Sequence, residues 1–244
     1  ELMSMIQLVA KDMNAQDIAN VIWAFARCKI DVGTSESLFV TLAERAFLEA
    51  DAFMAQEIAN VFWSSAKLHR RSAPVSPFLD VLPMLSEVAV QQADAMKAQE
   101  IANTLSGICD LRNEVSISIF ERDLIPILAE MFIKKAAKLT DRQLILDFPE
   151  VALALAKLQI PHRPLIKTIA SRCQKPGMLR KMHESDWGLC VWGLCALTWS
   201  YTDGFPDAEF SEFRASLRAE VARRGTISEE MISRSQLGPD EWQL

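Results

Sequence analysis

The sequence predicts an all-α protein, an α-solenoid of about five antiparallel helix-turn-helix repeats of 39–47 residues. Three observations support this fold class. One short segment recurs along the chain at nearly regular intervals, and its apolar residues follow the spacing of a helix. No segment of useful length alternates apolar and polar residues between Asn-Gly or Asp-Gly turns, as the strands of hairpins do.

The recurring segment begins with Gln, an acidic residue and Ile-Ala-Asn. Its first copy covers residues 16–28, and the second follows 40 residues later at 56–68. A third copy begins 43 residues further on at Gln99 and lacks the tryptophan of the first two. The fourth copy is degenerate and ends at Leu158, and the fifth covers 187–197. We therefore expect leading helices near residues 14–29, 54–69, 97–112, 140–158 and 185–200.

A less similar apolar segment follows each copy and is expected to form the trailing helix of the pair. These segments cover residues 37–50, 78–90, 124–137, 165–173 and 210–223. Asn14 and Thr140 each precede an acid or an amide by three residues, the pattern of a capping box. Pro83 and Pro149 fall inside periodic segments and should kink or shorten those helices.

The repeats are expected to form a single array over residues 1–224. Residues 1–11 look like the tail of a preceding trailing helix, so further repeats before Glu1 remain open. Residues 225–244 are expected to form a C-terminal cap or tail. Tetratricopeptide repeats fit this array poorly, because their period of about 34 residues is shorter than the offsets found here.

The composition is that of a globular protein, with 50% hydrophobic and 24% charged residues among 244. Charged residues interrupt every apolar stretch of about 18 residues, so membrane insertion is not expected. The five cysteines are an odd number and include no Cys-x-x-Cys pair. They argue against a disulfide framework and a zinc ribbon, and they favour a reducing compartment.

Catalysis, a metal site and a cofactor are not expected. His69, His162 and His183 fall in different repeats, and none has a nucleophile or carboxylate at a spacing that would bring acid and base together. Cys190 and Cys195 are separated by about 140° around a helix, so we interpret them as small core residues and not as ligands of one metal ion. Glycine-rich phosphate loops are also missing.

Basic residues are concentrated in one segment of an otherwise acidic chain of net charge −6. Residues 134–181 carry 11 Lys and Arg against 3 Asp and Glu. These cations could contact RNA phosphates or an acidic protein, or they could simply be solvated side chains on helix surfaces. The candidates for RNA contact in this segment are Lys134, Lys135, Arg163, Lys167 and Arg172.

The leading helices are expected to expose only a narrow polar strip. Two apolar stripes cover more than half of the first helix, so Trp23, like Trp63 and Trp192, is expected to be buried between neighbouring repeats. The strip holds Gln16, Asp17, Asn20, Ala24 and Arg27, and later Asn60, Ser64 and Lys67, then Asn103, Gly107 and Asp110, then Glu150, Ala154 and Lys157.

Two properties of this strip suggest a column of ligand contacts. Its middle position is always small, with Ala24, Ser64, Gly107, Ala154 and Gly193 in the five copies, and could leave room for a flat group. An amide could read the edge of an unpaired base, and a cation could hold its phosphate. Alternatively, the small residues let neighbouring helices approach, and each asparagine bonds to nearby backbone.

The segments at 15–27 and 55–67 resemble the octotricopeptide repeat and the related heptatricopeptide repeat of protist mitochondria. The FAST-kinase-like proteins share a similar helical array. The resemblance spans roughly residues 14–200. Many family members end in a RAP domain, but residues 225–244 are too short for one.

That resemblance implies an α-solenoid located in chloroplasts or mitochondria, although no targeting peptide is visible in the sequence. Most characterised members bind organellar RNA and govern its stability, splicing, processing or translation, whereas some are structural parts of organellar ribosomes. Carried over to this chain, the resemblance implies RNA contact by Asn20, Arg27, Asn60, Lys67, Asn103 and Lys157.

The sequence therefore suggests two alternative functions. The first is an organellar protein that contacts single-stranded or ribosomal RNA, with no affinity for DNA expected. The alternative is a non-catalytic, architectural subunit that binds other proteins within a large organellar assembly, such as a ribosome or a respiratory or photosynthetic complex. The sequence does not identify the organelle, the RNA or the protein partners.

Overall fold

The structure, a computed structural model, describes residues 2–33, 35–160, 162–175 and 177–181, with 215–216, 219–220 and 222–223. Every regular element within these residues is helical, which confirms the all-α class. The chain divides into two compact units, residues 1–131 and 132–244. The expected leading helix at 185–200, with Trp192, and the tail at 225–244 lie outside the described residues.

The described helices occur in both units. The first unit contains α1 (Leu2–Val9), η1 (Ala10–Asp12), α2 (Ala15–Arg27), α3 (Glu36–Leu48), η2 (Ala50–Ala52), α4 (Ala55–His69), α5 (Ser76–Leu79), α6 (Leu82–Gln92), α7 (Ala98–Asp110), α8 (Ser118–Glu121) and the start of α9 (Leu124–Ala136). The second unit contains the end of α9, then α10 (Asp141–Lys157), α11 (Arg163–Cys173) and η3 (Leu179–Lys181). Helices α2, α4, α7 and α10 cover the first four segments in which leading helices are expected.

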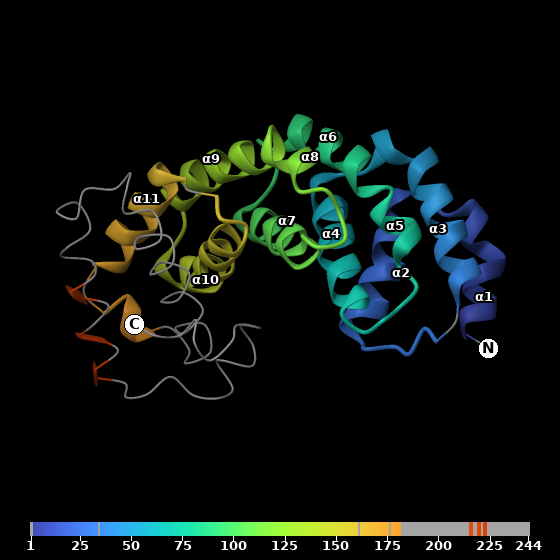
Figure 1. The fold of residues 1–244 in the computed structure, drawn as a ribbon, viewed down its shortest axis with the longest axis horizontal. Coiled ribbons are helices and arrows are strands. Elements are labelled where there is room, and N and C mark those ends of the chain that lie inside the picture. The colour runs from blue at the N-terminus through green and yellow to red at the C-terminus, as the bar shows by residue number, and fades with distance from the viewer. Residues whose placement is uncertain are drawn as a thin grey trace. The chain divides into compact units, whose positions relative to one another are not determined.

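The first unit has two layers of helices. In one layer α2 packs against α4, and α4 packs against α7 (Figure 1). The second layer contains α3, α5 and α6, in which α3 contacts α2 and α5, and α6 contacts α4, α5 and α8. Helices α2 and α4 therefore each lie beside the next leading helix and against a trailing helix.

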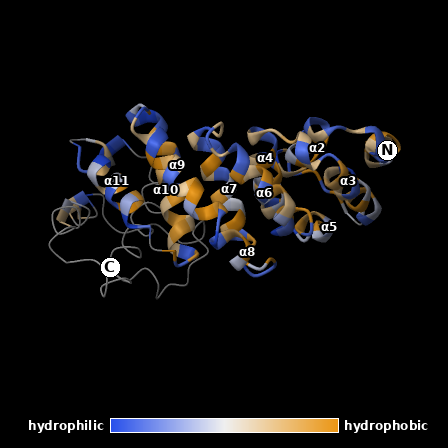
Figure 2. Ribbon diagram, turned by 90° about the horizontal axis from the view of Figure 1, so that it is seen from above, coloured by the Kyte–Doolittle hydropathy of each residue, from blue (hydrophilic) through white to orange (hydrophobic). Residues whose placement is uncertain are grey.

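Phenylalanine side chains fill the space between the two layers. Phe39 of α3 contacts Phe25 of α2, with ring centroids 6.3 Å apart, and Phe78 of α5, with centroids 6.2 Å apart. Phe62 of α4 meets Phe120 of α8 at 5.9 Å. All five rings are buried, and Figure 2 shows hydrophobic and hydrophilic residues on the same helices, as amphipathic packing requires.

The acidic residue of the recurring segment caps its helix. The carboxylates of Asp17, Glu57 and Glu100 accept hydrogen bonds from the backbone N–H groups three residues earlier, at 3.2, 2.8 and 2.8 Å. At the first helix Asn14 completes the predicted capping box, because its side chain accepts from the backbone of Asp17 at 2.9 Å. The acid is thus explained by helix formation and not by ligand binding.

The remaining sequence signals for helix ends have mixed outcomes. Thr140 forms the second predicted capping box with Gln143 at the start of α10. Pro83 follows a break in the predicted helix at 78–90 and lies in the first turn of α6. Pro149 does not shorten its helix, because α10 continues through it to Lys157. Burial of Pro149 and of its neighbours Phe148 and Val151 favours the continuous helix despite the lost hydrogen bond.

In the second unit, the turn between α9 and α10 is tied to the end of α11. Arg172 donates a hydrogen bond to the carbonyl oxygen of Leu139 at 3.0 Å and pairs with Asp141 at 3.5 Å. Phe132 and Phe148 meet with centroids 5.9 Å apart. Asp147 is buried on α10, and this burial raises the pKa of its carboxyl group to about 6.

Candidate functional site

The solvent-facing side of α2, α4 and α7 carries four rows of side chains, each row with one residue from every helix. Within a helix the rows follow one another at steps of 4, 3 and 4 residues, so they lie along one side. Eleven of the twelve residues are exposed or half-exposed, and the side chain of the twelfth, Asp110, is 7% exposed. We name this surface the leading-helix face; its rows are Gln16, Gln56 and Gln99; Asn20, Asn60 and Asn103; Trp23, Trp63 and Ser106; and Arg27, Lys67 and Asp110.

The expectation that the tryptophans are buried is wrong for the first helix. Trp23 is 40% exposed, and Trp63 is half-buried. The exposed strip is rotated around the helix toward the tryptophans by about 40° relative to the predicted one. At the opposite border of the strip, the small residue of α7, Gly107, is covered by the preceding leading helix, α4.

Three small residues of the strip, Ser64, Gly107 and Ala154, leave no space for a ligand, whereas Ala24 is half-exposed. A Cβ atom built on Gly107 would lie 2.6 Å from the carbonyl oxygen of Phe62, so α7 meets the backbone of α4 at this glycine. Ser64 is fully buried, and Ala154 is also buried. These positions allow close approach of helices, which is the alternative reading of the pattern. Gly193, the fifth member, lies outside the described residues.

The cation row is partly neutralised within the protein. Lys67 Nζ lies 3.4 Å from Asp110 Oδ2 and 5.7 Å from the centroid of the Trp63 ring. The guanidinium group of Arg70 pairs with the other carboxylate oxygen of Asp110, whose side chain is only 7% exposed. Lys67 of α4 and Arg70, which directly follows α4, therefore share one buried acid of α7, whereas Arg27 is exposed on α2.

The other predicted RNA contacts lie in the second unit. Lys134, Arg163 and Lys167 are exposed, whereas Lys135, Lys157 and Arg172 are half-buried. Arg163 and Lys167 are one helical turn apart on α11, and Lys134 and Lys135 lie in the last turn of α9. Arg172 already binds Leu139 and Asp141, so this side chain has a structural role in the unit.

Two features of the leading-helix face were missed in the sequence: the recurrence of Gln16, which was placed on the strip, at Gln56 and Gln99, and the exposure of the tryptophans. A signal for the glutamines was available, because Gln16, Gln56 and Gln99 recur although the neighbouring acid alone explains the cap. Trp23 and Trp63 also recur, but helical spacing places them at the border between buried and exposed positions. Only the packing of adjacent helices decides which side of that border is covered.

The histidines of the described segments have structural partners. His69 Nε2 lies 3.3 Å from a carboxylate oxygen of Glu114, and His162 Nδ1 accepts from the backbone N–H of Leu165 at 3.3 Å, capping α11. Within the part of the chain that the structure describes, no three His, Cys, Asp or Glu side chains gather in a way that could hold a metal ion. His183, Cys190 and Cys195 lie outside it.

Among the helices of the described residues, none combines the length and apolarity needed to cross a membrane. No protein-family model matches the chain, and no curated protein is significantly similar to it.

Proposed function

We propose that the chain is an α-solenoid that binds single-stranded RNA through the leading-helix face, as an organellar factor in RNA processing, stability or translation. The observation that carries this proposal is the repetition of the four rows of that face. An asparagine and a glutamine recur on three helices that pack side by side, where they cap no helix and fill no core. The organellar location rests on the sequence resemblance.

A solenoid requires that each helix pair contact mainly its neighbours in sequence. The packing of α2 against α4 and of α4 against α7 has this property in the first unit. The contacts of α2 with α3 and of α4 with α6 provide the pairing of leading and trailing helices in this unit. The close approach of Gly107 to Phe62 further supports a regular array, because a small residue recurs at the same place in each leading helix.

The chemistry of the face suits unpaired bases. A side-chain amide both donates and accepts hydrogen bonds, so Asn20, Asn60 and Asn103 can bind the Watson–Crick edge of a base that is not already paired. Trp23 offers an exposed aromatic surface on which a base can stack. Arg27 is placed one turn away, where it can bind a phosphate.

The charges of the face predict weak to moderate affinity. Asp110 compensates Lys67 and Arg70, so few phosphate contacts are expected from the three helices. Each phosphate contact contributes a slope of about −0.7 to the dependence of log K on log salt for single strands. We therefore expect binding with a shallow salt dependence, unless Lys134, Arg163 and Lys167 of the second unit also take part.

Fluorescence anisotropy with a labelled RNA of about 12 nucleotides tests the proposal, since single-strand sites span about that length. The triple variant Asn20→Ala, Asn60→Ala, Asn103→Ala should lose binding about tenfold or more. Gln91→Ala, which removes an exposed amide from α6, is the control and should bind as the wild type does. Absence of binding at low salt, or equal binding by the triple variant, would contradict the proposal.

A second candidate function is that of an architectural subunit that binds proteins. The compensation of Lys67 and Arg70 by Asp110 favours it, because a phosphate-binding surface would leave these cations available. Purification of the native protein from cells separates the two functions. Co-purifying RNA would support the first, and a fixed set of protein subunits without RNA would support the second.

A further inference from the structure

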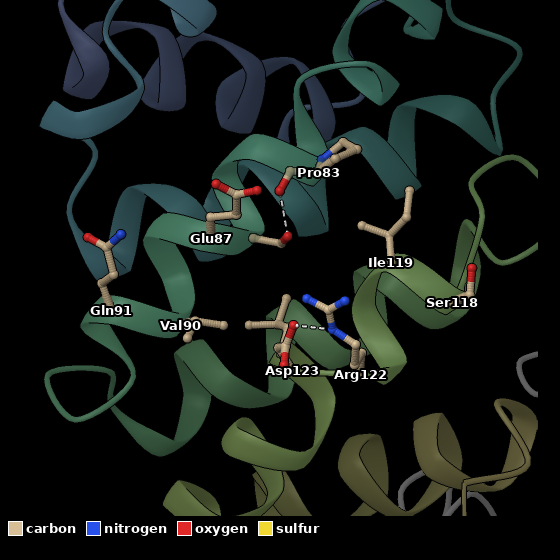
Figure 3. A pocket seen from close by; sticks show the side chains of 10 residues that line it. Pro83, Glu87, Val90, Gln91, Ser118, Ile119, Arg122 and Asp123 are labelled. Carbon is tan, nitrogen blue, oxygen red and sulfur yellow. Dashed lines mark hydrogen bonds and ion pairs between the residues drawn. The ribbon is translucent and has the colours of Figure 1, made fainter.

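The trailing helices of the first unit form two grooves that occupy equivalent places in successive repeats. The first groove lies between α3 and α5 and has a volume of about 590 Å³. The second has α6 on one side and residues 118–124, which comprise α8 and the turn after it, on the other; its volume is about 580 Å³ (Figure 3). Almost every residue that lines the first groove has a counterpart lining the second, 43 positions further along the chain. The groove is therefore a repeated element of the fold.

Each groove has one carboxylate on either wall. Glu44 of α3 and Asp80 after α5 line the first groove, and their counterparts Glu87 and Asp123 line the second. All four residues are exposed. In the second groove Arg122 donates to Asp123 at 2.9 Å, an ion pair drawn in Figure 3. No lysine or arginine occurs among the described residues that line the first groove.

The two grooves differ in the side chains between these carboxylates. The first groove presents Val40, Phe47 and Leu48, which are 38%, 61% and 71% exposed. At the positions of Phe47 and Leu48 the second groove has Val90, which is half-exposed, and Gln91, which is polar. Exposed large apolar side chains in a concave surface are typical of sites where a partner buries its own apolar groups.

We propose that the first groove is a docking site for an amphipathic segment of a partner protein that carries bulky apolar side chains next to Lys or Arg. The apolar side chains of the partner contact Val40, Phe47 and Leu48. Its cation lies between Glu44 and Asp80, where it meets negative charge from both walls. The groove is long enough in helix α3, from Val40 to Leu48, to accept more than one turn of a partner helix.

The negative charge of the first groove disfavours RNA and anionic lipids as its partners. Two carboxylates repel the phosphates of RNA and the headgroups of anionic lipids. In the second groove Arg122 pairs with Asp123, which reduces the negative charge that a basic partner could meet there. The docking site lies on α3 and α5, whereas the leading-helix face lies on α2, α4 and α7, so failure of RNA binding leaves this proposal untouched.

A peptide-display library of random sequences, selected on the full-length protein and counter-selected on Phe47→Gln, Leu48→Gln, tests the proposal. Both side chains are largely exposed, so the double variant should remain folded. The expected result is enrichment of peptides that combine Leu, Ile, Met or Phe with Lys or Arg. Selection of no binder, or of binders without a basic residue, would overturn the proposal.

One enriched peptide is then titrated by fluorescence anisotropy. Glu44→Gln with Asp80→Asn should weaken its binding about tenfold, since removing contacts at the centre of an interface has effects of that size. The matched control is Glu87→Gln with Asp123→Asn in the second groove, which should change binding less than about twofold. If both double variants weakened binding equally, the effect would come from the net charge of the protein and not from the first groove, which would overturn the proposal. Self-association of the wild type that Phe47→Gln, Leu48→Gln abolishes would assign the groove to a second copy of the chain and also overturn it.

Discussion

Gly107 of α7 contacts the backbone of Phe62 in α4, where even a Cβ atom would lie 2.6 Å from the carbonyl oxygen and 2.7 Å from the carbonyl carbon. Such distances require the two helices to move apart. The glycine thus sets the separation between two adjacent leading helices, and with it the spacing of the rows of the leading-helix face.

We expect Gly107→Ala to destabilise the protein. Overpacking costs about 1–3 kcal/mol, and the upper part of this range applies because the Cβ atom would meet backbone atoms; this outweighs the gain of about 1 kcal/mol that alanine normally gives within a helix. A net loss of about 1–2 kcal/mol should appear as a lower midpoint of urea unfolding. Ser106→Ala, on the half-exposed side of the same helix, is the control and should leave the midpoint nearly unchanged. A more stable Gly107→Ala variant would contradict the close helix contact.

Asp110→Asn should change stability and RNA binding in opposite directions. The variant leaves Lys67 and Arg70 without their shared, largely buried acid, which should cost about 1–2 kcal/mol of stability. The same change removes an acid from the leading-helix face and releases Lys67 from its ion pair. RNA affinity at low salt should therefore rise, and the salt dependence should become steeper by about one unit of slope or more.

Asp123→Asn provides the control for this experiment, because it removes an acid of the trailing helices whose ion pair is exposed. It should change neither the unfolding midpoint nor RNA binding appreciably. Anisotropy titrations at several salt concentrations measure affinity and slope together. Unchanged RNA affinity of Asp110→Asn would indicate that Lys67 and Arg70 do not contact RNA.

The helices and their ends could be predicted from sequence, because they depend on local features. Apolar spacing indicates α2 and α4, and side chains such as Asn14 and Thr140 bond to backbone only three residues away. The choice between a ligand column and a helix contact at Gly107 could not be made in this way. Helical spacing gives the direction of a side chain around the axis, but not which neighbouring helix occupies that direction.

The candidate sites were predictable to a smaller extent. The asparagine row follows from the repeat itself, whereas the exposure of Trp23 depends on the helices packed around α2. The grooves of the trailing helices were not predicted, because the side chains at equivalent positions differ in type. Val90 in the second groove replaces Phe47 of the first, and Gln91 replaces Leu48. The repetition of the groove is visible in the sequence through its carboxylates, such as Glu44 and Glu87.

Trp23→Ala should weaken RNA binding with little effect on folding. Trp23 is 40% exposed, so its removal should lower stability without preventing folding, whereas stacking of one base on an aromatic side chain contributes about 1–3 kcal/mol to binding. Phe47→Ala is the matched control, since it removes an exposed ring from α3. Anisotropy with the same single-stranded RNA should detect the loss only in Trp23→Ala. Equal affinities of the two variants would exclude stacking at Trp23.

Removal of the buried carboxylate at Asp147 should stabilise the second unit at neutral pH. Burial raises the pKa of Asp147 from 3.8 to about 6, so the folded state binds a proton more tightly than the unfolded state. The contribution of this tighter proton binding to the stability of the folded state is complete below pH 3.8 and is lost as the pH rises through about 6. The difference between 3.8 and about 6 corresponds to about 3 kcal/mol, and solvent screening of this partly buried carboxylate reduces its cost at pH 7 and above to about 2 kcal/mol. Asp147→Asn should raise the unfolding midpoint at pH 7.5 more than at pH 5, and Glu130→Gln, an exposed acid on α9, should show no such difference. Parallel pH profiles for wild type and Asp147→Asn, measured by urea unfolding, would show that this carboxylate is solvated in the folded protein.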